Sequence, residues 1–105
     1  MNELRNAKIL RIQKVHDYWQ IFTDKGIVNC YNPAIYRTTT GDSLDLEHWR
    51  DIVNRVVTNI LIIEEKALCF VLDNESSIEI SLAPGDYFGP EAFEISLDSG
   101  VTIVD

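Results

Sequence analysis

The amino-acid sequence predicts an α+β fold in which antiparallel strands dominate, and three observations support this prediction. Short segments alternate apolar and polar residues with a period of two, which is typical of strands with one buried face. Turn-forming residues separate these segments. One stretch, residues 43–53, spaces its apolar residues three and four apart, which is typical of a helix. The 105 residues are enough for one domain, 1–105.

The first third of the chain predicts a three-stranded meander. Its turns are expected at His16-Asp17 and at Thr23 to Gly26, where turn-forming residues interrupt the apolar pattern. The meander is followed by Pro33-Ala34-Ile35-Tyr36. The predicted strands are residues 8–15, 18–22 and 27–31.

The single predicted helix follows a poor helix-forming connector, Thr38 to Gly41. Acidic residues gather at its start, where the helix dipole favours negative charge. The helix is expected to end near Val53 to Arg55, because the β-branched residues from Val56 onward prefer strands. Its apolar stripe consists of Leu46, Trp49, Ile52, Val53 and Val56, and Trp49 is expected to be a core residue. Its candidate caps are Asp42, Ser43 and Asp45.

The last half of the chain predicts a second three-stranded meander and a C-terminal hairpin. Residues 67–72 are apolar on both faces and indicate a central strand. Residues 93–97 alternate strictly, and Asp98-Ser99-Gly100 turns them into a partner strand over 101–104. The remaining strands are expected from residue 56 onward and around residues 78–82.

The two meanders resemble each other and predict an internal repeat with units 9–36 and 58–87. Trp19 matches Leu68, and two extra residues in the second copy then align Asn29 with Ile80 and Tyr36 with Tyr87. Both units close on a Pro-x-x-Tyr sequence. The alternative is that any two β-meanders look alike. In either case the helix is expected to link the two meanders.

Charge is distributed unevenly along the chain. The formal net charge is −8, and residues 38–105 hold fourteen acidic side chains and three basic ones. Such a surface repels a phosphate backbone, so no direct nucleic-acid binding is expected. It attracts a basic partner, although an acidic surface also serves solubility alone. No segment approaches the length of a membrane span, and no export signal precedes the domain, so we expect a cytoplasmic protein.

The residue types that carry enzyme chemistry do not form a recognisable motif. Cys30 and Cys69 lie far apart in apolar segments and are expected to be buried free thiols. They and the two histidines lack the spacing of a metal site. His48 and Asp51 can meet on one helical face, but no nucleophile accompanies them. We therefore expect no catalytic residues, no metal and no cofactor.

The segment from Gly85 to Phe93 combines two glycines, a proline and several aromatic residues. This composition predicts a rigid loop that forms either a local mini-core or a recognition surface. The mini-core is favoured, with Tyr87 and Phe88 packing on the end of the sheet. Asp86 and Glu91 then form its exposed acidic edge.

Two segments, DYWQIFTDKGIVNCYNP and LDNESSIEISLAPGDYFGPEAFEI, resemble a family of small bacterial proteins of uncharacterised function. Proteins of this type occur among the immunity proteins of polymorphic and contact-dependent toxin systems. The resemblance covers residues 9–36 and 58–104, and its most specific part is Gly89-Pro90-Glu91-Ala92-Phe93. It implies a β-rich fold without enzyme activity, and it supplies no catalytic residues.

These observations lead to one functional hypothesis and one alternative. The protein is expected to be a toxin-neutralising immunity protein that blocks a basic toxin domain, with a nuclease as one candidate. The alternative is a small-ligand or regulatory binding domain without a toxin partner. The oligomeric state stays open. The expected partner-binding residues are Glu79, Asp86, Glu91 and Glu94.

Overall fold

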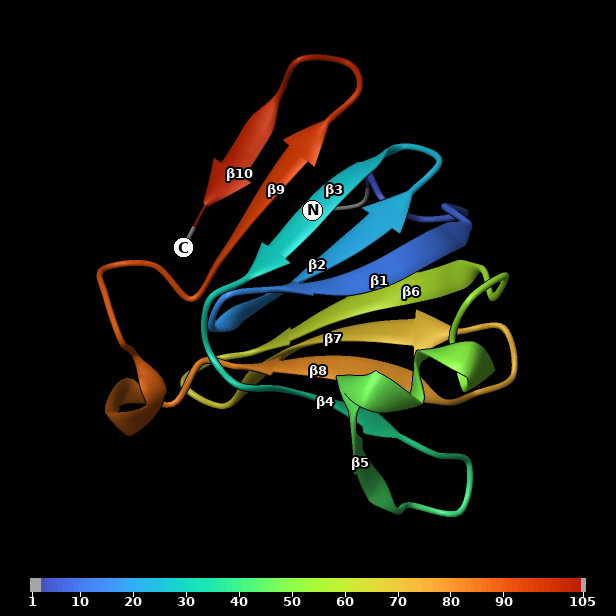
Figure 1. Cartoon of the computed structure of the whole chain (residues 1–105), viewed down its shortest axis with the longest axis horizontal. Helices are drawn as coiled ribbons and strands as arrows, with labels where there is room; N and C mark the ends of the chain where they lie inside the picture. The colour runs from blue at the N-terminus through green and yellow to red at the C-terminus, as the bar shows by residue number, and fades with distance from the viewer. Residues whose placement is uncertain (1–2, 105) are drawn as a thin grey trace.

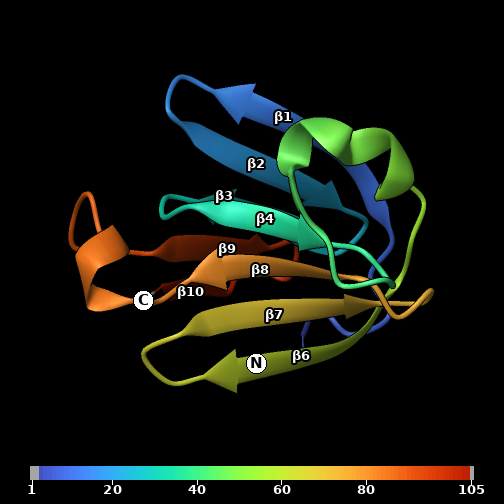
Figure 2. The same ribbon diagram turned by 90° about the horizontal axis from the view of Figure 1, so that it is seen from below.

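In the computed structural model, which describes residues 3–104, two five-stranded antiparallel sheets pack face to face (Figures 1 and 2). In spatial order, the first sheet contains β1 (Ile9–Val15), β2 (Tyr18–Thr23), β3 (Gly26–Cys30), β9 (Phe93–Leu97) and β10 (Thr102–Val104). The second contains β5 (Ser43–Asp45), β4 (Ala34–Arg37), β8 (Ser77–Ser81), β7 (Ala67–Leu72) and β6 (Val57–Ile63).

The chain crosses between the sheets twice. After β3 it enters the second sheet as β4, which pairs with β8, and after β8 it returns to the first sheet as β9, which pairs with β3. Asn32 lies buried at the first crossing, where its side-chain amide donates to the carbonyl of Ser81 at 2.8 Å. Each sheet is therefore completed by a hairpin from the other half of the sequence.

Both sheets have the same strand order. Read from one edge, each begins with the three strands of its meander and ends with the hairpin that comes from the other half of the chain. The backbone hydrogen bonds where β1 and β6 begin are also equivalent. The Asn6 N–H donates to the Val57 carbonyl at 2.7 Å, and the Asn54 N–H donates to the Ile9 carbonyl at 2.8 Å. Both asparagines have positive φ, 72° and 75°. The arrangement fits an internal repeat, and gene duplication stays a prediction.

The strand register corrects the residue correspondence between the two meanders. Gln20 faces Asn29 in the first, and Cys69 faces Glu79 in the second. Asn29 therefore corresponds to Glu79, and the predicted match to Ile80 is wrong by one residue. A shift of one residue exchanges the two faces of a strand. The buried residues agree with this register, because Val28 and Cys30 then correspond to Ile78 and Ile80.

The matching Pro-x-x-Tyr endings are also not structurally equivalent. Tyr36 lies buried in β4 opposite Ile78, whereas Tyr87 follows η2 (Pro84–Asp86) outside any strand. The two segments share only the proline and the tyrosine, and this match was too short to reveal that the second copy carries a longer connection at this point.

The predicted α+β class is wrong, because among residues 3–104 no α-helix links the meanders. The segment 43–53 forms strand β5 and η1 (Leu46–Asp51), a short 3-10 helix that is interrupted at His48. Asp45 does cap this turn, since its side chain accepts the Glu47 N–H at 2.9 Å. A helix of so few residues gains little from propagation. The spacing of three fits a 3-10 helix as well as an α-helix, and Leu46 and Ile52 are both fully buried.

The core lies between the sheets and is filled by aliphatic residues from both. Its largest fully buried side chain is Phe93, at the start of β9. Trp19 is only partly buried against this core, which is less than the sequence predicts. Trp49 is 39 % exposed, so its assignment to the core is wrong. It extends from the short η1, where the Arg50 guanidinium lies 5.1 Å from the centre of its ring.

Candidate functional site

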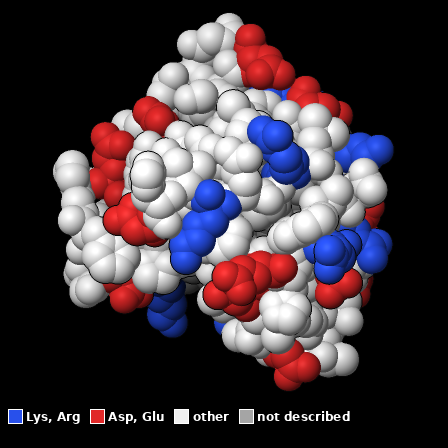
Figure 3. Space-filling view, in the orientation of Figure 1, with Lys and Arg blue, Asp and Glu red and all other residues white. Residues whose placement is uncertain are grey.

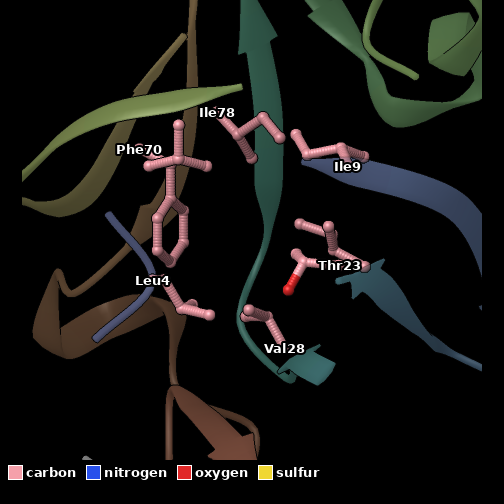
Figure 4. Close-up of a pocket in the computed structure, with 8 residues that line it drawn as sticks. Leu4, Ile9, Thr23, Val28, Phe70 and Ile78 are labelled. Atoms are coloured by element: carbon pink, nitrogen blue, oxygen red, sulfur yellow. The ribbon is translucent and has the colours of Figure 1, made fainter. Parts of the chain in front are cut away.

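The interior of the sandwich formed by residues 3–104 contains a cavity that is too small for a ligand. Figure 4 shows side chains from both sheets converging on a cavity of about 10 Å³, among them Ile9, Phe70 and Ile78. This volume is at the lower limit for a single water molecule. The Thr23 hydroxyl points into this region but donates to the Gly26 carbonyl at 2.8 Å. A small-ligand function would therefore need a site on the surface.

The best candidate site is an open hollow of about 370 Å³ at one end of the first sheet. Three separate parts of the chain form it. The β1–β2 turn contributes Asp17 and the following Tyr18, the end of β3 is continued by Tyr31, and the loop between η2 and β9 contributes residues 88–91. The loop is the segment that the sequence marks as rigid, and the fold places it beside two tyrosines that are distant in sequence.

Aromatic rings form one part of the hollow. Tyr18 and Tyr31 pack edge to face, with ring centroids 5.2 Å apart and an interplanar angle of 63°. Phe88 is 83 % exposed, the highest value among the large apolar side chains in the described part of the chain. The predicted mini-core is therefore wrong for Phe88, although Tyr87 does pack against the core. An aromatic ring that projects into water beside a hollow is typical of a recognition surface.

Carboxylates form the other part of the hollow. Asp17 and Glu91 line it directly. Glu94 lies next to it in β9, where its Oε1 accepts from the Tyr31 hydroxyl and from the Asn29 amide, each at 3.3 Å. Burial, followed by the charge of Glu94, raises the pKa of Tyr31. This tyrosine therefore stays protonated at neutral pH and can hold the Glu94 carboxylate in place.

A hollow of this composition can bind a positively charged group. The face of an aromatic ring attracts a cation, and the attraction is stronger for a guanidinium or ammonium that also meets a carboxylate. None of the residues that line the hollow is Lys or Arg. Figure 3 shows acidic side chains on the left of the molecule, the side on which the η2–β9 segment lies. The site is therefore suited to a lysine or arginine side chain of another molecule.

The fold separates the four residues predicted from the sequence into two pairs. Glu91 and Glu94 belong to the hollow. Glu79 and Asp86 lie together at another shallow hollow beside the second sheet, which Lys66 also lines. The sequence reasoning treated the four as one surface because it could not tell that β8 and β9 belong to different sheets.

Glu79 is not a free negative charge. Its carboxylate receives two hydrogen bonds from the Arg37 guanidinium, at 2.7 and 3.2 Å. The Arg37 guanidinium lowers the pKa of Glu79, against the opposing effect of burial. Asp86 accepts a hydrogen bond from the Ser81 hydroxyl and stays exposed. Of the four predicted carboxylates, Glu79 is therefore the one whose charge is offset by an ion pair.

The sequence reasoning missed Asp17, Tyr18, Tyr31 and Phe88 as parts of one site. The sequence marked the His16-Asp17 turn and the Gly89-Pro90 loop separately. Only the pairing of β3 with β9 brings them together, because the Tyr31 and Asn32 N–H groups both donate to the Ala92 carbonyl at 2.9 Å. A search for exposed turns that carry both aromatic and acidic residues would have found both halves.

Neither thiol is placed for nucleophilic chemistry. Burial raises the pKa of Cys30 to about 12, and burial also raises the pKa of Cys69, with a smaller effect from Glu79. The thiolate is the reactive form, so both side chains are unreactive at neutral pH. Among residues 3–104, no cluster of three or more potential metal ligands occurs, and no helix has the length and hydropathy needed to cross a membrane.

Comparison with known proteins does not place this chain in a family, since no protein-family model, curated protein or solved structure matches it.

Proposed function

We propose that the protein is a binding protein that neutralises a cationic toxin domain in the cytoplasm, in the manner of an immunity protein. The observation that carries this proposal is the hollow lined by Asp17, Glu91 and three aromatic rings, with Glu94 bound to the Tyr31 hydroxyl beside it. The net charge of −8 supports it, because an acidic surface accelerates encounter with a basic partner.

The geometry assigns different roles to the residues of the hollow. Phe88 is the candidate anchor, because an exposed aromatic ring that becomes buried dominates many interfaces. Asp17 and Glu91 act on encounter, since exposed charges change the association rate more than the final affinity. The Tyr31 hydroxyl and the Asn29 amide position Glu94. A lysine or arginine of the toxin would enter between Phe88 and the tyrosine pair.

The experiment begins with affinity capture from cells that produce the protein, followed by identification of the captured toxin domain. Association is then measured in stopped flow at low and at physiological salt. The hollow variant carries Asp17→Asn, Phe88→Ala and Glu91→Gln. We expect its association to slow on the order of tenfold at low salt, and this difference to shrink as salt screens the charges.

The matched control carries Glu79→Gln and Asp86→Asn, which removes two carboxylates from the other pair. It should associate at nearly the wild-type rate, since one of them is already paired with Arg37. Equal rates for the hollow variant and the wild type would show that the contact lies elsewhere. A captured partner without a basic surface, or cells that the protein does not protect from it, would refute the proposed function.

The hollow also gives a second candidate, a small cationic ligand bound without any toxin partner. Its volume of about 370 Å³ lies within the range of small-molecule sites, although it is open to solvent. Titration with arginine and with tetramethylammonium, followed by NMR of the tyrosine rings, tests this alternative. Saturable shifts of Tyr18 and Tyr31 that Phe88→Ala abolishes would favour it.

A further inference from the structure

Strand β6 is an edge strand without the usual protection against pairing. Its seven residues, Val57–Ile63, include no charged side chain and no proline. Leu61, Ile62 and Ile63 are 45 %, 57 % and 47 % exposed. Within the described chain, β7 is the only strand that pairs with it. An exposed apolar edge of this kind invites pairing with another strand.

Only the second half of this edge is free. The carbonyl of Val57 already accepts the Asn6 N–H, and the carbonyl of Thr58 accepts the Arg5 guanidinium at 3.2 Å. Beyond this point the edge has only a local bond, in which the Asn59 side chain accepts the Ile60 N–H at 2.9 Å. An incoming strand can replace that bond. The segment available for pairing is therefore residues 59–63.

We propose that a second copy of this chain docks on β6, antiparallel, with Leu61 opposite Leu61 of the second copy. This register uses all of the free segment and nothing else, because residue 59 then faces residue 63 and residue 60 faces residue 62. Ile60 and Ile62 form apolar pairs on one face, and the two Leu61 side chains meet on the other. The two second sheets join into one ten-stranded sheet.

Charge complementarity at the ends of the segment identifies a second copy as the occupant. In this register Thr58 faces Glu64 of the second copy, and the Arg5 guanidinium is already held at the Thr58 carbonyl. Arg5 and Glu64 therefore meet at both ends of the paired segment, once for each copy. A self-complementary pattern of this kind fits the same strand inverted.

The interface is small, so the association should depend on protein concentration. Five paired residues in each chain bury less than the roughly 1,200 Å² of a stable interface. Dissociation constants in the micromolar range or weaker are expected. The interface shares no residue with the hollow, so this proposal and the proposed function can fail separately.

The test is sedimentation equilibrium of the full chain from micromolar to millimolar concentration. The wild type should shift from monomer to dimer, and Leu61→Lys should weaken dimerisation at least about tenfold, because it places like charges directly opposite each other. The matched control is Gln13→Lys, at the corresponding position of β1, and it should dimerise like the wild type. Circular dichroism verifies that both variants fold.

Charge exchange tests the register itself. Glu64→Arg should weaken the dimer, and adding Arg5→Glu in the same chain should restore it. A wild-type protein that stays monomeric at millimolar concentration would refute the proposal. So would a dimer that Leu61→Lys leaves intact, or one that Leu61→Lys and Gln13→Lys weaken equally. Failure of the charge exchange, with Leu61→Lys still disruptive, would refute this register.

Discussion

The first strands of the two meanders, β1 and β6, occupy equivalent edges but differ in how they meet solvent. Both begin with a register shift, and the residues after it correspond, Gln13 to Leu61 and Lys14 to Ile62. On β1 the Lys14 ammonium lies 5.6 Å from the centre of the Trp19 ring, and Gln13 donates to Gln20 at 2.9 Å. On β6 the same positions are apolar and exposed. The side chains of β1 thus protect its edge, whereas those of β6 leave its edge apolar and exposed.

The two edges also differ in what lies across them. The η1 segment packs against β1, β4 and β5, and Figure 2 shows it across the gap between β1 and β4. Its Leu46 is fully buried. In the described chain no helical segment packs in this way against β6, and Ile62 stays exposed although it faces the same side of the sheet as Leu68.

The outer faces of the two sheets also differ in polarity, and the second sheet is again the more apolar one. On the first sheet, side-chain amides form a chain of hydrogen bonds across four strands, which ends at Glu94 beside the hollow. The corresponding row on the second sheet runs through Leu61, Cys69 and Glu79. Its polar links are made by Glu79, which accepts from Arg37 and from the Ser77 hydroxyl. The first sheet therefore presents a fixed polar face, and the second presents an apolar edge.

The largest expected effect on stability comes from comparing Leu46, which is buried under η1, with Ile62, which is exposed on β6. We call these the covered side and the open side. Leu46→Ala should lower the free energy of unfolding by about 2–5 kcal/mol, because it leaves a cavity under η1. Ile62→Ala should change it by less than about 1 kcal/mol in the monomer, since that side chain is mostly exposed. Urea unfolding at low protein concentration measures both. A similar loss for the two variants would show that the open side is packed as tightly as the covered one.

The difference between the edges can be reversed by substitution. Gln13→Leu with Lys14→Ile gives β1 the side chains of β6, and we expect the double variant to self-associate more strongly than the wild type. Static light scattering against concentration measures the change. The matched control, Gln13→Asn with Lys14→Arg, keeps the edge polar. Unchanged scattering by the apolar variant would mean that η1 closes β1 independently of its side chains.

The two thiols allow a comparison of core and outer face. Cys30 corresponds to the core residue Ile80, whereas Cys69 corresponds to the outer-face residue Gln20. With the pKa of Cys30 raised to about 12 and that of Cys69 also raised, both should react slowly with Ellman's reagent at pH 8, and Cys69 should react first. Single Cys→Ser variants identify the signals, and denaturant should make both fast. A faster Cys30 would contradict the placement of β3.

The smallest effect concerns acid. The pKa of Glu79 is lowered by Arg37, so the ionised carboxylate stabilises the folded state above its ordinary pKa of 4.5, and this contribution is lost as the pH falls through the lower folded value. Glu79→Gln should therefore be less stable than the wild type near pH 7, with a difference that shrinks below pH 4.5. Thermal unfolding over this pH range measures it. Gln13→Ser removes a hydrogen bond between two uncharged amides, so it should give a difference that does not change with pH.

The apolar patterns located most of the strands, but not β4 or β5, the second of which lies in the predicted helix. Residues 67–72 and 93–97 form strands with the predicted bounds, because alternation and apolar runs reflect local geometry that survives in any sheet. The acidic character of the C-terminal half and the turn at Gly89-Pro90 could likewise be read from the sequence. Two residues of the candidate site, Glu91 and Glu94, followed from these two features.

Only the tertiary structure decided which strands are neighbours and what the segment around Leu46 becomes. A spacing of three allows either an α-helix or a 3-10 helix. The segment forms a 3-10 helix, in which Leu46 and the following Ile52 are both buried. Pairing between β3 and β9 joins residues more than sixty positions apart, and no local pattern encodes it. That pairing places Tyr31 beside Glu94, and it separates Glu79 from the hollow. The site is therefore a product of two chain crossings, whereas its individual residues are visible in the sequence.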